Sequence, residues 1–560
     1  MALPLVAGGL VSMWLLSRLA LSGDALYVIG GTVTGAGAGH DPSELFLARP
    51  LVHRAYLGGL TTLVQSVGLD PAGQGGMLAI RAAGWLTAAL ACVVLWRGLS
   101  RHTGHLEAGW SAAAAFLALA FAPNWSALQP DWLAVVIAVG ALGSSLLSHR
   151  LWGPAVGGVL LALALGSKIA AIPWVLLSLL VLALLARRRA VVAGVVALAA
   201  SLLMFAVEQQ VMPWEIQWLR DQVALVDESP LSTGMTPSSI AHGIKDTVDV
   251  AIINPVVWAA VPAVVVLVLR RGSTRRALLL SAGIAITALA LAVGSGYGQF
   301  EHFSYHWVGL PVLAAGALAW ALAEDPRGRT QLTVGGLVSG VLAVVATTRP
   351  VQWRETDTHI LAMFFALGSV SVLASWRALA AHRASRTSPD SAVGAAAGAV
   401  LVAAVLVAPL VPGVPGSFAM YNAAGPVGRP IAAHTAELAD LERIRPVLPA
   451  DETVLYLTYG VTNAVLGNPA TCRYPSPQWL QRAPRTPAVR EMWSYRDNLT
   501  CLRPDPPAFV VWDTRWFPHR TMTPEVRSYL DGFFDCGPER RLVITQSRVW
   551  VCPRRIPGPG

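Results

Sequence analysis

Long apolar runs recur through the first 411 residues and constrain the fold of this chain more than any other feature. Each run has about 17 to 22 residues, enough for a helix to cross roughly 30 Å of hydrocarbon, and together they predict about thirteen spans. Only 13% of the residues are charged, whereas soluble domains carry about 25%. The predicted spans are 2–22, 77–98, 107–123, 131–148, 152–167, 169–186, 190–207, 251–269, 277–293, 306–323, 330–348, 358–376 and 391–411.

Arginine predicts the orientation of these spans. The net charge is +9, and Lys168 and Lys245 are the only lysines. Short loops on one side of the predicted membrane hold most of the arginines, which places that side and the N-terminus in the cytoplasm. An odd number of spans then places the C-terminus outside. Because loop arginines account for the charge, we expect no nucleic-acid partner. The opening residues lack a basic segment, so we expect the first span to be retained.

The outer loop of residues 23–76 follows the first span directly. Asp24 lies just beyond the predicted hydrocarbon edge. We expect a Gly/Thr loop over 30–40 and then a short helix, with Asp41 as N-cap, Pro42 at its first position and Glu44 at its third. Arg49-Pro50 ends that helix.

A second helix of this loop begins at Leu51. Its apolar residues recur at helical spacing, and its polar face holds His53, Arg54, Thr61 and Gln65. One apolar face beside a polar one predicts a helix that lies along the membrane surface.

The residues after Pro412 contain no span and predict an extracytoplasmic α/β domain over 412–560. We expect strands over 453–457 and 508–512, a hairpin over 541–545 and 548–552, and helices over 432–445 and 523–534. Four cysteines in this domain predict two disulfides with three possible connectivities, and four free core thiols are the alternative. These cysteines are Cys472, Cys501, Cys536 and Cys552.

Ionisable residues at the predicted outer edge are the main functional signal, because charge at that depth is costly unless it is used or paired. Asp131 has a plain alternative role as an N-cap after Pro130, and Lys168 as a cation that reaches lipid phosphate. His302 and His306 are spaced to share a metal, or are solvated loop residues. The full set is Asp24, Arg81, Asp131, Lys168, Glu301, His302 and His306.

Short phrases accompany these residues in a fixed order. Ala48-Arg49-Pro50-Leu51-Val52 follows the acid after span 1, and Ala79-Ile80-Arg81 opens span 2. Gln129-Pro130-Asp131-Trp132-Leu133 stands in a short outer loop, and Gly166-Ser167-Lys168 precedes a proline-containing span. In the tail, Asn468 to Tyr474 and Leu502 to Val511 form two further phrases. This order resembles the GT-C superfamily of polyprenyl-phosphate-dependent membrane glycosyltransferases, chiefly its aminoarabinose-transferase and protein-mannosyltransferase-like members.

The resemblance covers nearly the whole chain, although its motifs are short, and the Ala/Gly/Arg bias suggests an actinobacterial source. It implies inverting transfer of a sugar from a polyprenyl-phosphate donor to a cell-envelope glycan or glycolipid outside the membrane. Asp24 would be the base, and positive charge would stabilise the leaving phosphate. The phosphate-binding candidates are Lys168, Arg81, Arg49 and Arg54.

One departure from the family concerns the acid itself. Many members have two adjacent acids after span 1, whereas Ala25 follows Asp24. Either Asp24 acts alone, or Asp41 or Glu44 supplies a second carboxylate. Asp131 would bind the acceptor or help hold a divalent cation such as Mg²⁺ or Mn²⁺.

Two other classes of function compete with this interpretation. A transporter or flippase of a lipid-linked substrate is disfavoured, because the ionisable residues gather at one membrane face rather than along a central path. A catalytically inactive, glycan-binding member of the family stays an alternative because of the single acid.

Overall fold

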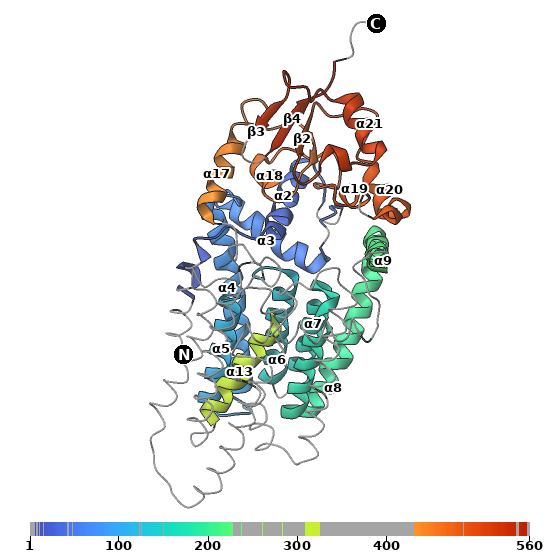
Figure 1. Cartoon of the computed structure of the whole chain (residues 1–560). Coiled ribbons are helices and arrows are strands. Elements are labelled where there is room, and N and C mark those ends of the chain that lie inside the picture. Colours follow the sequence, from blue (N-terminus) through green and yellow to red (C-terminus); the bar gives the residue numbers. More distant parts are fainter. Residues whose placement is uncertain are drawn as a thin grey trace, which may run out of the picture. The chain divides into compact units, whose positions relative to one another are not determined.

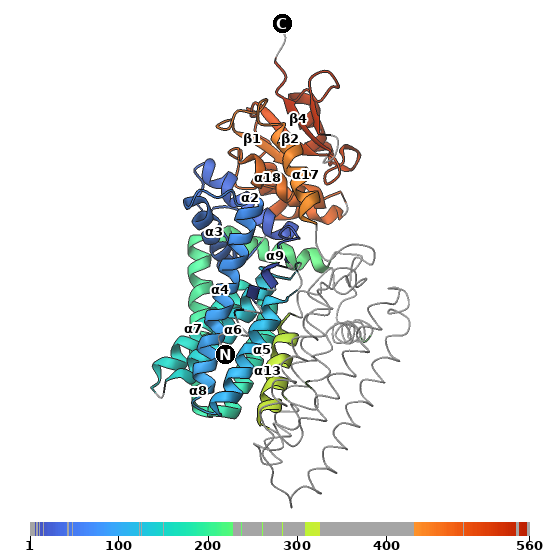
Figure 2. The same cartoon turned by 90° about the vertical axis from the view of Figure 1, so that its left-hand side faces the viewer.

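The computed structural model describes residues 16–227 (without 42, 43, 48, 123, 125 and 149), 308–324 and 430–556 (without 485 and 545–547), with isolated positions elsewhere. Contacts divide the chain into two compact units (Figures 1 and 2). The helical unit contains the described residues of Met1–Leu16, Gly84–Leu202 and Thr233–Val427. The mixed unit contains those of Ser17–Ala83, Leu203–Ser232 and Gly428–Gly560.

Apolar helices make up the helical unit, and they match the predicted spans in the described part of the chain. The region predicted as spans 169–186 and 190–207 is one continuous run that is kinked at Ala186, where φ is −157° and ψ is 75°. The elements are α4 (Gln74–Leu99, in this unit from Gly84), α5 (His105–Ala120), α6 (Pro130–Leu147), α7 (Trp152–Ser167), η1 (Ile169–Ala171), α8 (Ile172–Val211, in this unit to Leu202) and α13 (Gly309–Glu324).

Three described stretches are long and apolar enough to cross a membrane, namely Gln74–Leu99, Pro130–Leu147 and Ile169–Val211. The helices Trp152–Ser167 and Gly309–Ala321 are apolar but shorter. The predicted spans 251–269, 277–293, 330–348, 358–376 and 391–411 lie outside the described residues, apart from single positions.

Glycines let the helices of this unit approach closely. A Cβ added at Gly143 of α6 would lie 2.4 Å from the backbone nitrogen of Leu95 in α4. A Cβ at Gly158 of α7 would lie 2.6 Å from the carbonyl oxygen of Ala193 in α8. Close contact between small residues is a common source of helix association where no hydrophobic effect drives it.

The mixed unit is assembled from three separate segments. The first two supply α2 (Gly23–Gly37), α3 (Leu51–Ser66) and α9 (Pro213–Asp227). The third supplies α17 (Ile431–Glu442), β1 (Val454–Leu457), α18 (Val461–Leu466), α19 (Gln478–Arg482), η4 (Pro487–Glu491), α20 (Trp493–Leu499), β2 (Phe509–Asp513), η5 (His519–Thr521), α21 (Pro524–Phe533), β3 (Leu542–Ile544) and β4 (Val549–Pro553).

A four-stranded sheet of order β1-β2-β4-β3 forms the core of the third segment. The strands β1 and β2 are parallel, and β4 pairs antiparallel with both β2 and β3. Val454, Val510 and Val549 are fully buried. The predicted strands, hairpin and two helices of this segment are confirmed within one to three residues. The parallel pair requires a long crossover between its strands, and α18, α19, η4 and α20 supply it.

The structure pairs the cysteines into one of the three connectivities. Cys472 bonds to Cys501 within the crossover, and Cys536 bonds to Cys552 of β4.

The predicted loop at 30–40 is wrong, because helix α2 runs through most of it to Gly37. The glycines lie at helix contacts rather than in a turn. A Cβ at Gly30 would lie 2.8 Å from the backbone nitrogen of Ala464 in α18, and one at Gly35 would meet the side chain of Leu45. Thr34 turns its hydroxyl back to the carbonyl of Gly30 at 2.9 Å, which satisfies it inside the helix.

The short helix predicted from Asp41 is also wrong for the described residues 44–47, which contain a turn and irregular backbone. The Glu44 backbone nitrogen donates to the Asp41 carbonyl at 2.8 Å, and the Asp41 backbone nitrogen donates to the Glu44 carboxylate at 3.3 Å, so the Glu44 half of a capping box forms. The chain then leaves the helical path, because the backbone nitrogen of Phe46 bonds to the carbonyl of Arg473 at 2.8 Å.

Helix α3 is present, but it buries part of its predicted polar face together with Leu57 and Val64 of its apolar face. His53, Arg54 and Thr61 are buried, whereas Leu63 and Val67 are 56% and 65% exposed. Helix α9, which was not predicted, explains why Arg54 is buried. It places Glu215 against this arginine.

Candidate active site

Asp24 lies in the first turn of α2, where the positive end of the helix dipole favours a carboxylate. The Ser22 hydroxyl caps this helix by accepting a bond from the backbone nitrogen of Ala25 at 3.3 Å. Arg49 approaches one Asp24 oxygen at 2.8 Å, and the Tyr459 hydroxyl donates to the other. The Asp24 and Arg49 side chains are 17% and 18% exposed. The carboxylate is therefore held on both oxygens yet remains within reach of solvent.

Tyr459 reaches Asp24 from the loop that follows β1. The next residue, Gly460, has φ of 76°, a left-handed conformation that favours glycine. The Tyr459 ring stacks on Tyr27 of α2 at 5.2 Å and on Trp516 at 5.4 Å. Burial raises the pKa of Tyr459, and the neighbouring Asp24 carboxylate raises it further. The hydroxyl therefore keeps its proton and remains a donor to Asp24.

The parallel strands β1 and β2 end close to Tyr459 and Trp516. Tyr459 follows β1 and Trp516 follows β2, so both rings stand beyond the carboxyl ends of the two parallel strands. In open α/β sheets this edge is the usual position of a ligand site. Here helix α2 brings a carboxylate to the same edge.

The close contact between α2 and α18 sets the position of Asp24 relative to Tyr459. Gly30 touches the backbone at Ala464, as described above. The Thr458 hydroxyl bonds to the side chain of Asn463, whose amide donates to the carbonyl of Pro475. The loop that carries Tyr459 is thereby anchored on both sides.

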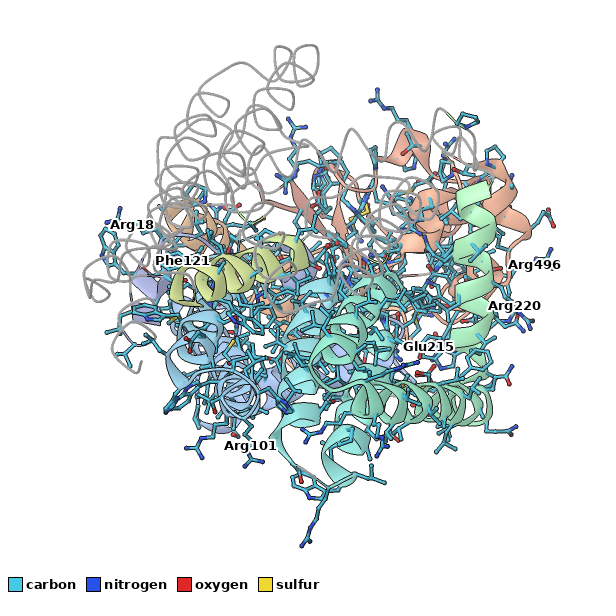
Figure 3. All side chains as sticks on the ribbon, turned by 90° about the horizontal axis from the view of Figure 1, so that it is seen from below. Arg18, Arg101, Phe121, Glu215, Arg220 and Arg496 are labelled. Carbon is cyan, nitrogen blue, oxygen red and sulfur yellow. A yellow bond between two sulfur atoms is a disulfide. The ribbon has the colours of Figure 1, made fainter. Side chains whose placement is uncertain are left out.

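A buried ion pair joins α3 to α9. Arg54 lies 2.6 Å from Glu215 (labelled in Figure 3), and their side chains are 3% and 4% exposed. Arg54 also donates to the carbonyl of Leu45 at 2.7 Å and lies over the Trp214 ring at 5.0 Å. Burial raises the pKa of Glu215, whereas the Arg54 charge opposes that shift. Since these contacts occupy the guanidinium, Arg54 has a structural role, which argues against the predicted phosphate contact.

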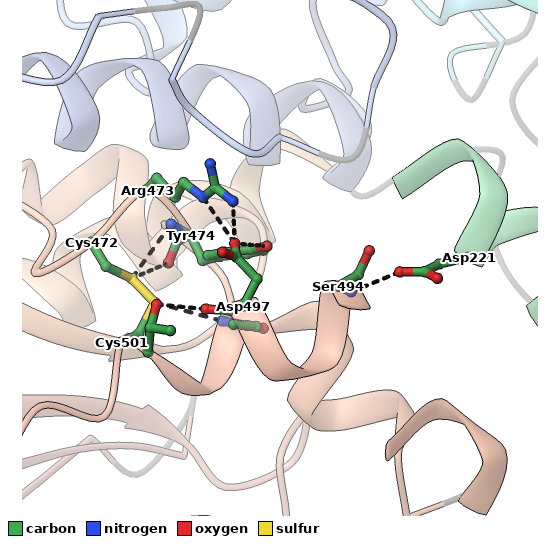
Figure 4. A network of polar contacts seen from close by, with 9 residues as sticks. Asp221, Cys472, Arg473, Tyr474, Ser494, Asp497 and Cys501 are labelled. Atoms are coloured by element: carbon green, nitrogen blue, oxygen red, sulfur yellow. Dashed lines mark hydrogen bonds and ion pairs between the residues drawn. A yellow bond between two sulfur atoms is a disulfide. The ribbon is translucent and has the colours of Figure 1, made fainter. Parts of the chain in front are cut away.

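A polar network lies beside this pair in the crossover (Figure 4). The Arg473 Nε donates to Asp497 at 2.9 Å, and the guanidinium faces the rings of Trp214 and Trp493. The Cys472–Cys501 disulfide joins the backbone next to Arg473 to the end of α20. Asp221 of α9 accepts from the backbone nitrogen of Ser494 at 2.7 Å. The disulfide and α9 therefore stabilise the same short stretch.

Lys168 and Asp131 form an ion pair in the helical unit. The Lys168 Nζ lies 3.0 Å from an Asp131 oxygen, where α7 ends and α6 begins. Asp131 is fully buried, whereas the Lys168 side chain is 20% exposed. The lysine is thus the member of the pair that a ligand can reach.

Arg81 is occupied by backbone. Its terminal nitrogens donate to the carbonyls of Leu19 and Ala20 at 2.7 and 2.9 Å, and the residue is 2% exposed. This geometry ties the start of α4 to the end of the first apolar segment, and it does not suit the predicted role in phosphate binding.

Glu44 is 59% exposed and pairs with His40 at 3.6 Å, and Asp41 is exposed. Glu301, His302 and His306 lie outside the described residues. Within the described part of the chain, no three His, Cys, Asp or Glu side chains are placed to hold a metal ion.

Sequence reasoning missed Tyr459, Trp516 and Glu215. The first two carried a usable signal, since each follows a predicted buried strand by a few residues, where ligand sites gather in α/β sheets. Glu215 carried none, because no helix was predicted in its loop.

No protein-family model matches the chain, and no curated protein matches it. Two crystal structures of ArnT from Cupriavidus metallidurans are similar to it. The one bound to undecaprenyl phosphate shares 14% identity at a TM-score of 0.52 and covers 100% of this chain and 98% of that chain. The apo structure shares 15% at 0.51 and covers 98% and 97%. At this identity the likeness establishes a shared fold.

A cryo-EM structure of arabinosyltransferase EmbB from Mycobacterium smegmatis is more distant, at 17% identity and a TM-score of 0.42, over 74% of this chain and 41% of that chain.

Proposed function

We propose that this chain is a membrane glycosyltransferase of the GT-C kind that moves a sugar from a polyprenyl-phosphate donor to a cell-envelope glycan or glycolipid. The setting of Asp24 carries the proposal: a carboxylate at a helix N-terminus, just after the first apolar segment, held by a cation and a tyrosine. The fold shared with ArnT, whose structure holds undecaprenyl phosphate, supports a lipid-phosphate donor.

Asp24 acts as the general base in this proposal. It takes the proton of an acceptor hydroxyl while that oxygen forms a bond to the anomeric carbon of the donor sugar. The bond from this carbon to the phosphate oxygen breaks, and the polyprenyl phosphate leaves with the electron pair. Attack opposite the leaving group inverts the anomeric centre. Each Asp24 oxygen has lone pairs beyond those engaged by Arg49 and Tyr459, so acceptor binding does not require both contacts to break.

Arg49 is the proposed cation for the donor phosphate beside Asp24, and it is partly exposed. In the helical unit, the partly exposed Lys168 is by itself a proposed phosphate-binding cation. Negative charge that develops on the leaving phosphate is stabilised by fixed cations of this kind. Asp131 is proposed to position the Lys168 ammonium.

The test is transfer of radiolabelled sugar from a panel of polyprenyl-phosphate sugars to endogenous acceptors in membranes. Asp24→Asn should lower transfer by about 10²- to 10⁴-fold, whereas Asp451→Asn, an exposed acid of the same unit, should leave it unchanged. Loss with Asp41→Asn instead would move the base to the second carboxylate.

An inactive, glycan-binding protein is the second candidate, because both Asp24 oxygens already have protein partners. Absence of transfer from every donor by folded wild type, together with retained glycan binding, would favour it. Movement of lipid-linked sugar across proteoliposomes without transfer would favour a flippase.

A further inference from the structure

Trp516 is the outer member of an aromatic stack that ends at the proposed base. The stack runs from buried Tyr27 through Tyr459 to Trp516, with ring planes inclined by only 18° and 16°. Tyr459 donates to Asp24 from the middle of this stack. Tyr27 is 2% exposed, whereas Trp516 is only half-buried, so the stack meets solvent at its Trp516 end.

The loop that carries Trp516 is held rigidly. Asp513 at the end of β2 accepts bonds from the backbone nitrogens of Arg515 and Trp516 at 2.9 and 3.3 Å, which closes an Asx turn. The carbonyl of Trp516 accepts from the side chain of Gln481 at 3.3 Å. The Trp512 indole donates to the carbonyl of Phe517 at 2.7 Å. A ligand that stacks on this ring would therefore order little additional chain.

We propose that Trp516, seated on Tyr459, is a binding platform for a sugar ring. One face of a sugar presents C–H groups that are apolar and slightly positive, and these complement the negative face of an aromatic ring. The ring follows the carboxyl end of β2 and stacks on Tyr459, whose hydroxyl donates to the proposed base Asp24. The inference deepens the proposed function and rests on it for the source of the sugar.

The stack also indicates which sugar unit is bound. A sugar ring on the side of Trp516 away from Tyr459 would lie one aromatic layer beyond Tyr459, and Tyr459 is the residue that contacts Asp24. The platform therefore holds a sugar next to the reaction centre rather than the reacting hydroxyl itself. That sugar belongs either to the acceptor glycan or to the donor, and kinetics separate the two.

Binding is tested first, with the full chain in nanodiscs on an array of neutral arabinosyl, mannosyl and galactosyl oligosaccharides. Trp516→Ala should weaken binding by at least about tenfold, and Trp516→Phe should restore part of it. Trp550→Ala is the matched control, because Trp550 is also half-buried, but the Arg541 guanidinium covers its ring at 3.9 Å. No binding by wild type, or equal binding by Trp516→Ala, would overturn the platform.

Transfer kinetics then separate the two sources of sugar. A rise of about tenfold in the acceptor KM of Trp516→Ala, with kcat retained, assigns the platform to the acceptor, and the same rise in the donor KM assigns it to the donor. Glycan binding that depends on Trp516 without any transfer would retain the platform and reject the proposed glycosyltransferase. Normal sugar transfer by Trp516→Ala, together with normal glycan binding, would reject the platform and retain the proposed glycosyltransferase.

Discussion

Removing Glu215 while keeping Arg54 should destabilise the mixed unit more than any change to a surface ion pair. The two side chains are 4% and 3% exposed and 2.6 Å apart, so a Glu215→Leu protein would bury an uncompensated guanidinium. Loss of one partner of a buried pair costs about 3 to 5 kcal/mol. We expect the lower end of this range, about 3 kcal/mol, because Arg54 keeps its bond to the Leu45 carbonyl.

Removing Arg54 should lower the free energy of unfolding less than removing Glu215 at neutral pH, and less again in acid. Burial already raises the pKa of Glu215, so in Arg54→Met this carboxyl takes up a proton and avoids part of the penalty. A folded-state pKa above the unfolded value makes stability fall as pH rises between the two values. The destabilisation of Arg54→Met should therefore be below about 3 kcal/mol at pH 7 and smaller at pH 5.

The assay is a double-mutant cycle on the thermal unfolding of protein in detergent, in which about 3 kcal/mol corresponds to a fall of roughly 6 to 12 °C for a unit of this size. Arg54→Met/Glu215→Leu should lose much less than the sum of the single losses, because no buried charge is left. Glu442→Ala is the control, since its pair with Arg445 is exposed by about half and should contribute under about 1 kcal/mol. Additive losses in the cycle, or a Glu215→Leu loss as small as that of the control, would refute the reasoning.

Two further predictions concern glycine and tyrosine. Gly30→Ala should destabilise the protein by about 1 to 3 kcal/mol, because the new methyl group meets backbone at 2.8 Å. Gly59→Ala, in open space on α3, should stabilise it by about 0.5 to 1 kcal/mol, and equal effects in thermal unfolding would contradict the close approach of α2 and α18. Burial raises the pKa of Tyr529 to about 12, and its buried hydroxyl has no hydrogen-bond partner among the described residues. Tyr529→Phe should therefore be as stable as wild type at pH 8 and more stable than wild type as pH rises from 10 to 12. Over that range Tyr529 ionises more readily in the unfolded chain than in the folded one, so the wild type loses free energy of unfolding and the phenylalanine variant does not. If the free energy of unfolding of the two proteins showed the same dependence on pH, the raised pKa of Tyr529 would be excluded.

Elements with a simple burial pattern could be predicted from the sequence. β1 and β2 are short apolar runs bounded by polar residues, and both were expected nearly where they occur. The same holds for α6, whose apolar run has the length of a membrane span, and for the shorter apolar helix α7. In these cases the residues of one segment decide their own structure.

Elements whose stability depends on a distant partner could not be predicted. The glycines of α2 are typical of a loop, and their weak helix propensity is offset by packing against α18, more than 400 residues later. Arg54 lies on the predicted polar face of α3, and it is buried because it pairs with Glu215, 161 residues away. A single sequence shows which residues are unfavourable in a helix or in the interior. It does not show the distant residue whose contact offsets that free-energy cost.

In the candidate site, too, some features could be predicted from local sequence and others depend on a distant partner. Asp24 was chosen because a carboxylate at the end of an apolar segment is expensive without a use, and that argument is local. Arg49 is its partner in space, whereas Arg54 and Arg81 have the same charge but contact protein carbonyls and Glu215. The three arginines cannot be told apart by spacing alone.

The contact between Tyr459 and Asp24 has a consequence for biogenesis. The two residues are 435 positions apart, so Asp24 leaves the ribosome roughly 20 to 90 s before its tyrosine, at 5 to 20 residues per second. Throughout that interval α2 lacks both α18 and the aromatic ring that covers Tyr27. Newly made chain would then expose an incomplete, partly apolar surface. A chaperone on the side where the C-terminal segment folds is therefore most needed late in synthesis, and a chain truncated before Tyr459 should be degraded rather than accumulate as a partly active enzyme.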